Sequence, residues 1–223
     1  MKLTRSLFRT ALVDTIPVMT GYLTLGAGLG VLLEAKGYGP LFALFMSGIM
    51  YAGSAQFLLA GVLSAPIPLP ELAVTQFLLN ARHIFYGISM IDKYRNTGTV
   101  KPYLIFGLTD ETYSLAAPKE ESTPYYFLVT LLDQIYWVSG TVLGTLVGRM
   151  IPFDMTGIDF ALTALFVSIF TEQWLSTSDH TPASAGILVS LLCLLIFGPD
   201  VFLIPSMIGI LAVLLVYRRL GHG

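Results

Sequence analysis

Eight apolar stretches, separated by short turns, occupy most of this chain of 223 residues. They lie at 11–33, 39–64, 71–91, 103–117, 125–150, 158–175, 184–198 and 201–217. A transmembrane helix needs about 20 apolar residues, and several stretches reach that length, whereas the fourth, seventh and eighth are shorter. The pattern predicts an all-α integral membrane protein with about 7–8 hydrophobic helical segments, some broken or re-entrant, in a single transmembrane domain over 1–223.

The composition supports a lipid environment. Hydrophobic residues make up 55% of the chain and charged residues 12%, about half the charged share of a typical soluble domain. One protein interior cannot bury so much apolar surface, so lipid must cover part of it. The net charge of −2 provides no basic surface for nucleic acid. A single cysteine, Cys193, allows no internal disulfide and no thiolate metal site.

The basic residues constrain the topology, because cytoplasmic loops are enriched in Lys and Arg. They gather near both ends and in one loop, at Lys2, Arg5, Arg9, Lys93, Arg95, Lys101, Arg218 and Arg219. We expect cytoplasmic termini and no cleavable signal. Placing the loop in the cytoplasm as well requires one incomplete crossing before it and another after it. The interrupted second or third segment and the short seventh are the candidates.

Two stretches of the chain resemble each other, at 11–23 and 130–142, and share an Asp, an Ile and a Gly at equivalent positions. With the incomplete crossings described above, segments one and five run in opposite senses. This predicts an inverted-topology repeat with halves 11–117 and 125–217, an arrangement found in many secondary transporters. Chance similarity among apolar residues is the alternative.

The second segment carries small and polar residues where a membrane helix is normally apolar, in YAGSAQFLL (51–59). Gln56 has an amide whose unpaired burial would cost several kcal/mol. We expect this stretch to interrupt its helix, so that the free N–H groups near Gly53 and Ser54 can bind an anion. Gln56 then holds either a ligand or the broken backbone.

The third segment has a polar face. Gln76, Asn80, His83 and Gly87 are spaced by four, three and four residues, so they share one side of a helix. Arg82 lies beside that side and needs a carboxylate or a set of carbonyls. The alternative is a polar seam that holds helices together, with Arg82 extending to the membrane interface and His83 a neutral core residue.

Four carboxylates lie in apolar surroundings. Asp133 lies deep in the fifth segment, which favours a cavity or ion-pair role, whereas Asp14 is equally explained as an interfacial residue. Asp110 and Glu111 point about 100° apart on a helix, so one can face Arg82 while the other faces water. Two crowded negative charges also favour proton binding by one of them.

Glycines recur four residues apart in segments one and five, at Gly26, Gly30, Gly140, Gly144 and Gly148. This spacing predicts close helix packing rather than a ligand site. The chain shows no nucleophile elbow, nucleotide-binding loop or metal-ligand spacing. We therefore expect no enzyme activity, no cofactor and no metal, and transport that is driven by an ion gradient or is passive.

The motifs YAGSAQF, LLNARHIFYG and TDETY, within a likeness that runs from Asp14 through the eighth segment, resemble the AzlC family, the large subunit of bacterial branched-chain amino-acid exporters. The resemblance implies export of leucine, isoleucine, valine and methionine across the bacterial cytoplasmic membrane. It also implies a small hydrophobic partner subunit of the AzlD type. A non-transporting scaffold or a channel-like subunit is the alternative function.

A branched-chain amino acid needs a carboxylate partner, an ammonium partner and an apolar slot. From the residues we expect a substrate site made of Gly53, Ser54, Gln56, Phe57, Phe77, Asn80, Asp133, Trp137 and Asp14. In it, backbone N–H groups receive the carboxylate, the amides orient the substrate, an aspartate approaches the ammonium and the aromatic rings form the slot. Asp110 or Glu111 carries a coupling proton, and Arg82 modulates its binding.

Overall fold

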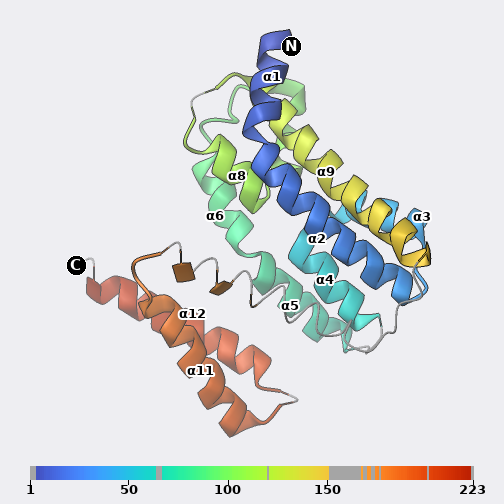
Figure 1. Cartoon of the computed structure of the whole chain (residues 1–223). Coiled ribbons are helices and arrows are strands. Elements are labelled where there is room, and N and C mark those ends of the chain that lie inside the picture. The colour runs from blue at the N-terminus through green and yellow to red at the C-terminus, as the bar shows by residue number, and fades with distance from the viewer. Residues whose placement is uncertain are drawn as a thin grey trace. The chain divides into compact units, whose positions relative to one another are not determined.

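The computed structural model describes residues 4–63, 67–119, 121–150, 167, 170–171, 174–175, 177–199 and 201–221. These residues are helical with short connections, and no strand occurs among them (Figure 1). The chain divides into two compact units, Met1–Leu162 and Thr163–Gly223. Most of the sixth predicted segment, Lys2 and the side chains of Arg218 and Arg219 lie outside the described residues.

The first unit contains most of the helices. They are α1 (Arg5–Asp14), α2 (Ile16–Ala35), α3 (Pro40–Met50), α4 (Gly53–Val62), α5 (Leu69–Asn80), α6 (Arg82–Ser89), a 3₁₀ turn (Gly98–Val100), α7 (Lys101–Phe106), α8 (Asp110–Ala116) and α9 (Thr123–Met150). Helices α2 and α9 are long and apolar enough to cross a membrane, and α3 and α4 are shorter apolar helices. The second, third and fourth predicted segments are each divided into two helices.

The expected interruption of the second segment is confirmed. Helix α3 ends at Met50 because Tyr51 adopts a left-handed conformation, with φ of 30°, which L-residues rarely adopt. Ala52 is extended, and α4 begins at Gly53. The third segment also divides, at Ala81 between α5 and α6.

A second helix break lies in the fourth segment rather than in the seventh. The seventh segment forms one uninterrupted helix, α11 (Thr181–Phe197), so no break is found in that candidate. The fourth segment is divided instead, at Gly107–Thr109. Thr109 stops the backbone from continuing as helix: it is extended, and its hydroxyl accepts a hydrogen bond from the Thr112 N–H, as at other helix N-termini.

Helices α2 and α9 lie side by side and form the core of the first unit (Figure 1). The predicted close packing at glycines is confirmed: a Cβ at Gly26 would lie 3.0 Å from the Thr141 nitrogen, and one at Gly140 would lie 2.9 Å from the Tyr22 oxygen. Further along, Gly148 lies against Val31. In these contacts, residues later in α2 meet residues later in α9. The two helices therefore run in the same sense. This contradicts the opposite senses expected for segments one and five.

Both helix breaks meet the middle of α9. Helix α3 runs opposite to α9, since Gly39 lies near Arg149 at the end of α9 and the Gly48 carbonyl accepts from Gln134 near its middle. The break after α3 therefore lies at mid-helix depth. The break before α8 reaches the same level, because the Thr112 hydroxyl donates to Asp133 at 3.0 Å.

The loop that carries Lys93 lies at the same end of this unit as the start of α2. The Lys93 ammonium donates to the carbonyls of Ala117 and Lys119 at 2.5 and 2.7 Å. Lys119 in turn contacts Asp14, the last residue of α1, at 2.5 Å. The first basic cluster and the basic loop therefore share one end, as the charge pattern predicted.

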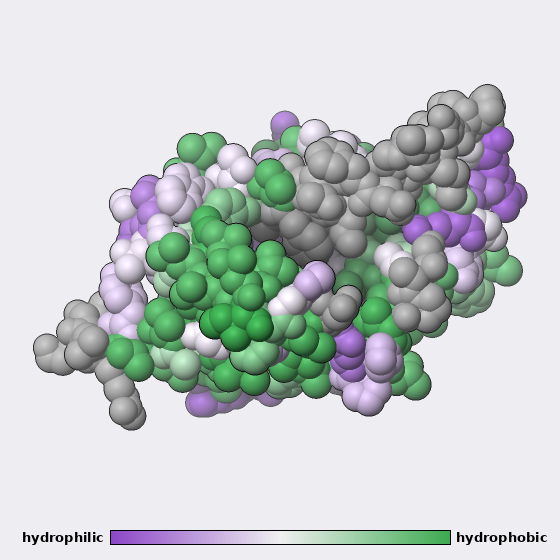
Figure 2. Space-filling model, turned by 90° about the horizontal axis from the view of Figure 1, so that it is seen from below, coloured by the Kyte–Doolittle hydropathy of each residue, from purple (hydrophilic) through white to green (hydrophobic). Residues whose placement is uncertain are grey.

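The second unit contains α11 and α12 (Leu203–Gly221), which form an antiparallel pair. Gly209 packs against Val189 midway along, and Tyr217 donates to Asp179 at the open end. No residue of α11 is buried, and Leu188 and Leu195 are more than half exposed. Figure 2 shows a patch of hydrophobic side chains in one part of the view. Such exposed apolar helices suit contact with lipid.

Candidate functional site

The first break is held by Gln56. Its side chain is fully buried, donates to the Met46 carbonyl at 2.9 Å and accepts from the Trp137 indole N–H at 2.7 Å. The Trp137 ring in turn covers Gly53, where a Cβ would lie 3.0 Å from it. Of the two interpretations of Gln56, the structure shows the one in which it holds the broken backbone, here together with the indole.

The second break carries charge, and Arg82 connects it to the first. The Arg82 guanidinium pairs with Asp110 at 2.8 Å, in the first turn of α8. It also lies 3.4 Å from the Ser54 hydroxyl in the first turn of α4. The expected pairing of Arg82 with a carboxylate is confirmed. The pair is about one third exposed, so both groups keep some contact with solvent.

A buried polar network lies beside this ion pair. Asp133 is fully buried and accepts from the Thr112 hydroxyl at 3.0 Å. Thr112 also contacts the Thr109 hydroxyl at 3.2 Å. Tyr22 on α2 contacts Thr109 at 2.8 Å and donates to Glu111 at 2.6 Å. Two carboxylates from different helices are thus joined through hydroxyl groups.

A cavity of about 290 Å³ lies where the two breaks and the α5–α6 bend meet. Its walls come from all three places: Met50, Tyr51, Ala52, Asn80, His83, Gly87, Ile105, Phe106 and Leu108. Tyr51 and Phe106 face each other at 6.1 Å between ring centroids. Asn80 Oδ1 is buried and has no hydrogen-bond partner among the described residues. The Tyr51 hydroxyl is likewise buried without a partner among these residues, so the cavity combines apolar walls with two unsatisfied polar atoms.

The predicted face of the third segment meets this cavity despite the bend at Ala81. Asn80, His83 and Gly87 line it, and His83 Nδ1 lies 3.1 Å from the Asn80 carbonyl. Gln76 points instead to the first break, where it donates to the Ala55 carbonyl at 2.9 Å. One helix face thus serves both the cavity and the broken backbone.

Most of the other predicted substrate residues do not line this cavity. Phe77 is 63% exposed on α5, and Phe57 is buried. Asp14 lies apart, at the end of the unit where α9 begins, and accepts from Lys119 at 2.5 Å and Tyr125 at 2.6 Å. The Lys119 ammonium beside it holds the pKa of Asp14 below its usual value, and Asp14 raises the pKa of Lys119.

Several residues that line the cavity were not among those predicted from the sequence. Tyr51 begins the stretch in which the interruption was expected, and Met50 precedes it, so extending the predicted site by one turn toward the N-terminus would have included both. Ile105 and Phe106 end the helix before the second break, which was itself not predicted. The signal for that break was Gly107 followed two residues later by a Thr and two acidic residues, a helix-start pattern.

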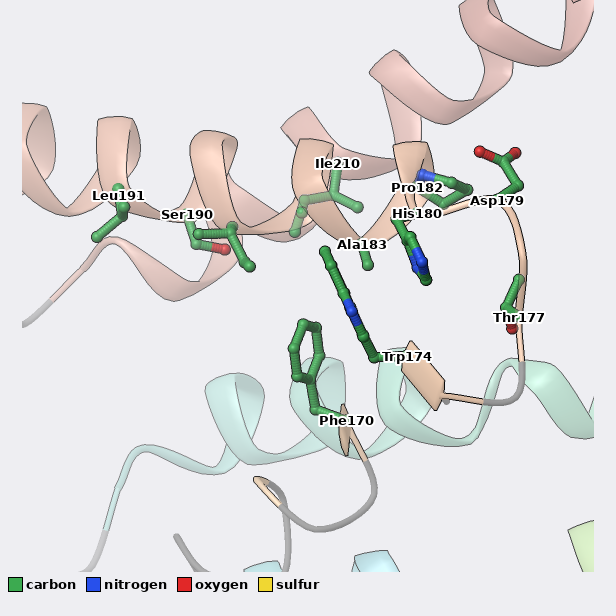
Figure 3. A pocket seen from close by; sticks show the side chains of 12 residues that line it. Phe170, Trp174, Thr177, Asp179, His180, Pro182, Ala183, Ser190, Leu191 and Ile210 are labelled. Atoms are coloured by element: carbon green, nitrogen blue, oxygen red, sulfur yellow. The ribbon is translucent and has the colours of Figure 1, made fainter. Parts of the chain in front are cut away.

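A second cavity, of about 640 Å³, lies within the second unit (Figure 3). The Trp174 ring stacks on His180 at 4.2 Å between centroids, and Phe170 tilts against Trp174 at 5.8 Å. These rings point into the cavity beside the start of α11 (Figure 3). None of the predicted site residues is among the described residues that line it.

Comparison with known proteins identifies the family. The family model described as AzlC protein matches residues 17–151, which include both long helices and both breaks. The chain belongs to the AzlC family. It is 41% identical over 218 residues to the branched-chain amino acid transport protein AzlC of Bacillus subtilis (strain 168), covering 95% of this chain and 85% of that protein.

Other relatives are named as membrane proteins. The chain is 38% identical over 217 residues to an uncharacterized membrane protein of Helicobacter pylori (strain ATCC 700392 / 26695), covering 95% of each. It is 29% identical over 175 residues to the inner membrane protein YgaZ of Escherichia coli (strain K12), covering 72% of this chain and 71% of that protein. No solved structure matches the chain. This AzlC-family chain is a helical membrane protein.

Proposed function

We propose that the chain is the transporting subunit of a secondary exporter for leucine, isoleucine, valine and methionine. One observation carries the proposal: a cavity with apolar walls and an unsatisfied polar atom lies at the meeting point of two helix breaks. Broken helices at mid-membrane depth form the substrate sites of many secondary transporters. The identity to a branched-chain amino acid transport protein supports the choice of substrate.

The cavity chemistry fits a zwitterion with an apolar side chain. The substrate side chain packs against Tyr51 and Phe106, two neighbouring rings that both line the cavity. Asn80 Oδ1 accepts a hydrogen bond from the ammonium group, because it has no partner among the described residues. The carboxylate approaches the first turn of α4, which begins next to the cavity residue Ala52 and contacts Arg82 through Ser54.

Proton coupling involves the charged second break. Asp110 is paired with Arg82, and Glu111 accepts from Tyr22. A substrate carboxylate that approaches Arg82 competes with Asp110 for the same guanidinium, so substrate binding and carboxylate charge are linked. Export therefore uses the proton gradient, with Asp110 or Glu111 as the group that carries the proton.

The chain acts in the cytoplasmic membrane of a bacterium as one multi-pass domain over 1–223, with both termini in the cytoplasm. The Lys93 loop and Asp14 lie at the same end of the first unit. This supports the orientation, because cytoplasmic loops are rich in Lys and Arg. A small hydrophobic subunit of the AzlD type completes the exporter. The chain is a transporter and not an enzyme.

A counterflow assay tests the proposal. Protein with its partner subunit is placed in lipid vesicles loaded with unlabelled leucine, and uptake of labelled leucine is measured. We expect exchange by the unaltered protein and a loss of at least about tenfold for Asn80→Ala, which removes a hydrogen bond to a charged group worth roughly 1.5–3 kcal/mol. Asn96→Ala, in an exposed loop, is the matched control and retains exchange.

The same assay separates the alternatives. A scaffold subunit gives no exchange in any condition, and a channel gives uptake that does not depend on internal leucine. Full exchange by Asn80→Ala would remove this cavity from the transport path.

A further inference from the structure

The hydrogen-bonded network beside the cavity forms an unbroken path between two carboxylates. Asp133 Oδ2 contacts Thr112 Oγ1 at 3.0 Å, and Thr112 Oγ1 contacts Thr109 Oγ1 at 3.2 Å. Thr109 Oγ1 contacts the Tyr22 hydroxyl at 2.8 Å, and that hydroxyl contacts Glu111 Oε2 at 2.6 Å. The path thus connects α9, α8 and α2. Each of its links is within normal hydrogen-bond length.

The number of hydrogens in this path is fixed by its chemistry. Four oxygen–oxygen contacts join the five side chains, but the three hydroxyl groups carry only three hydrogens. When both carboxylates are ionised, one contact therefore lacks a hydrogen. One additional proton, on either carboxylate, gives every contact a hydrogen. The path has room for one proton more than its hydroxyl groups supply.

The surroundings favour uptake of that proton. Asp133 is fully buried and forms no ion pair among the described residues, and an uncompensated carboxylate in a membrane interior is costly. The titratable groups that face it are Tyr51 from the first break, Tyr103 from α7 and Glu111 from α8. These groups are neutral or acidic.

The far end of the path, at Glu111, lies among similar groups. Glu111 faces Tyr22 on α2, Tyr51 at the first break and Tyr86 on α6, in addition to Asp133. Arg82, a nearby cation, is engaged by Asp110, the neighbour of Glu111. The negative charge of one of the two carboxylates, Asp133 or Glu111, is therefore neutralised by a proton rather than by a fixed cation.

We propose that Asp133 and Glu111 share a single transported proton, which moves between them through Thr112, Thr109 and Tyr22. The proposal rests on the proton-coupled transport proposed above. It assigns to Asp133 a proton-binding role in place of an ammonium-binding one. It also makes the three hydroxyl groups positioning residues for proton transfer.

The transfer step is balanced. A proton on Glu111 passes to the Tyr22 oxygen while Tyr22 gives its own hydrogen to Thr109. Thr109 gives its hydrogen to Thr112, and Thr112 gives its hydrogen to Asp133. Each hydroxyl group loses one hydrogen and regains one, so the net change is one proton moved from Glu111 to Asp133. Reorientation of the hydroxyl groups resets the path.

Vesicles that contain the full chain and its partner subunit, with a pH-sensitive dye inside, test this path. Two quantities are measured: leucine–leucine exchange, which requires no net proton movement, and proton flux during leucine transport. We expect Thr112→Val and Tyr22→Phe to retain exchange within about twofold and to lose proton flux by about a hundredfold, the lower end of the range for removing a positioned proton-transfer group. Thr112→Ser keeps the hydroxyl group and restores proton flux.

Thr141→Val is the matched control. Thr141 is also fully buried on α9, but its hydroxyl donates to the Trp137 carbonyl of its own helix and lies outside the path. It should leave both quantities unchanged. Proton flux at the normal rate in Thr112→Val or Tyr22→Phe would overturn the proposal. If Thr112→Val does not fold, the proton flux of Tyr22→Phe tests the path at its other end.

Measurements on the unaltered protein separate failure of the proposed transport function from failure of the proton path. Absence of leucine exchange overturns the proposed function itself. Exchange without any proton flux leaves the transporter but overturns both proton coupling and the path. Proton flux that persists in the path variants overturns the path alone.

Discussion

The two helix breaks meet the same stretch of α9 but differ in chemistry. The break at Tyr51–Ala52 is uncharged and is held by Gln56, an amide whose hydrogen bonds go to a carbonyl and an indole. The break at Gly107–Thr109 is followed directly by Asp110 and Glu111. One break is therefore fixed by neutral hydrogen bonds, and the other by charge and hydroxyl groups.

This difference shows how one small region can bind both an apolar substrate and a proton. A neutral break next to aromatic walls suits an apolar side chain with little penalty for removing water. A charged break can gain or lose a proton, and its state changes with what Arg82 contacts. The cavity lies between them, so each break can contribute its own chemistry to a single transport cycle.

The largest expected effect concerns the amide of the neutral break. Gln56→Leu leaves the Met46 carbonyl and the Trp137 N–H without their partner in a buried site. We expect a loss of about 2–6 kcal/mol of unfolding free energy, at roughly 1–3 kcal/mol for each of the two unsatisfied groups. Thermal or denaturant unfolding in detergent measures it. Adding Trp137→Phe should cost less than the sum of the two single changes; simple additivity would contradict the shared contact.

A smaller effect is expected where the two breaks are connected. Arg82→Gln leaves Asp110 without its ion pair and lowers leucine exchange by roughly thirtyfold, about 2 kcal/mol, which is below the 3–5 kcal/mol of a fully buried pair because this pair is one third exposed. Asp110→Asn in the same chain should recover part of the exchange, since it removes the stranded charge. Normal exchange in Arg82→Gln alone would separate the two breaks functionally.

The walls of the cavity can be tested at Gly87. This residue lines the cavity, and a Cβ there would meet nothing within 4 Å. Gly87→Val should fill part of the cavity and shift the ratio of leucine to valine exchange toward valine by about fivefold, near 1 kcal/mol, as expected for a change of one methylene in an apolar pocket. Gly21→Val, where a Cβ also has free space outside the cavity, should keep the ratio. An unchanged ratio in Gly87→Val would place the substrate elsewhere.

The smallest effect concerns the ion pair between Lys119 and Asp14, at the end of the first unit where α9 begins. Lys119→Met should cost about 0.5 kcal/mol of unfolding free energy near neutral pH, as for other partly exposed ion pairs. The pKa of Asp14 is lowered from 3.8 and that of Lys119 is raised from 10.5. The contribution is therefore fully present between these two values, and it is lost as pH falls through the lowered pKa or rises through the raised one.

Unfolding measurements at pH 3 and pH 7 check this: the difference between the two proteins should shrink at pH 3. A difference that grows on acidification would show that Asp14 is not stabilised in its charged form.

The sequence was informative where local chemistry decides the structure. Small residues before Gln56 indicated the first break, and the spacing of Asn80, His83 and Gly87 indicated a polar face that meets the cavity. The glycines of segments one and five indicated a close helix contact. In each case the signal lies within one or two turns, because helix geometry alone determines which residues share a face.

Features that depend on tertiary packing were not predictable in the same way. Phe77 and Phe106 are equally apolar in the sequence and both are exposed, yet of the two Phe106 alone lines the cavity. The relative sense of α2 and α9 follows from which other segments turn back, and no break at Gly107–Thr109 was predicted from the sequence. The pairing of Asp133 with Thr112 joins residues on two helices, which no spacing rule connects.

The glycine contact between α2 and α9 has a mechanical consequence. Backbone atoms of one helix lie where side chains of the other would normally be, so no flexible side chain is present to absorb sliding or separation. Dense contacts of this kind resist gradual deformation. We therefore expect the two helices to stay together as one rigid body, so that in the proposed transport cycle the shorter helices packed against them are the parts that open the cavity.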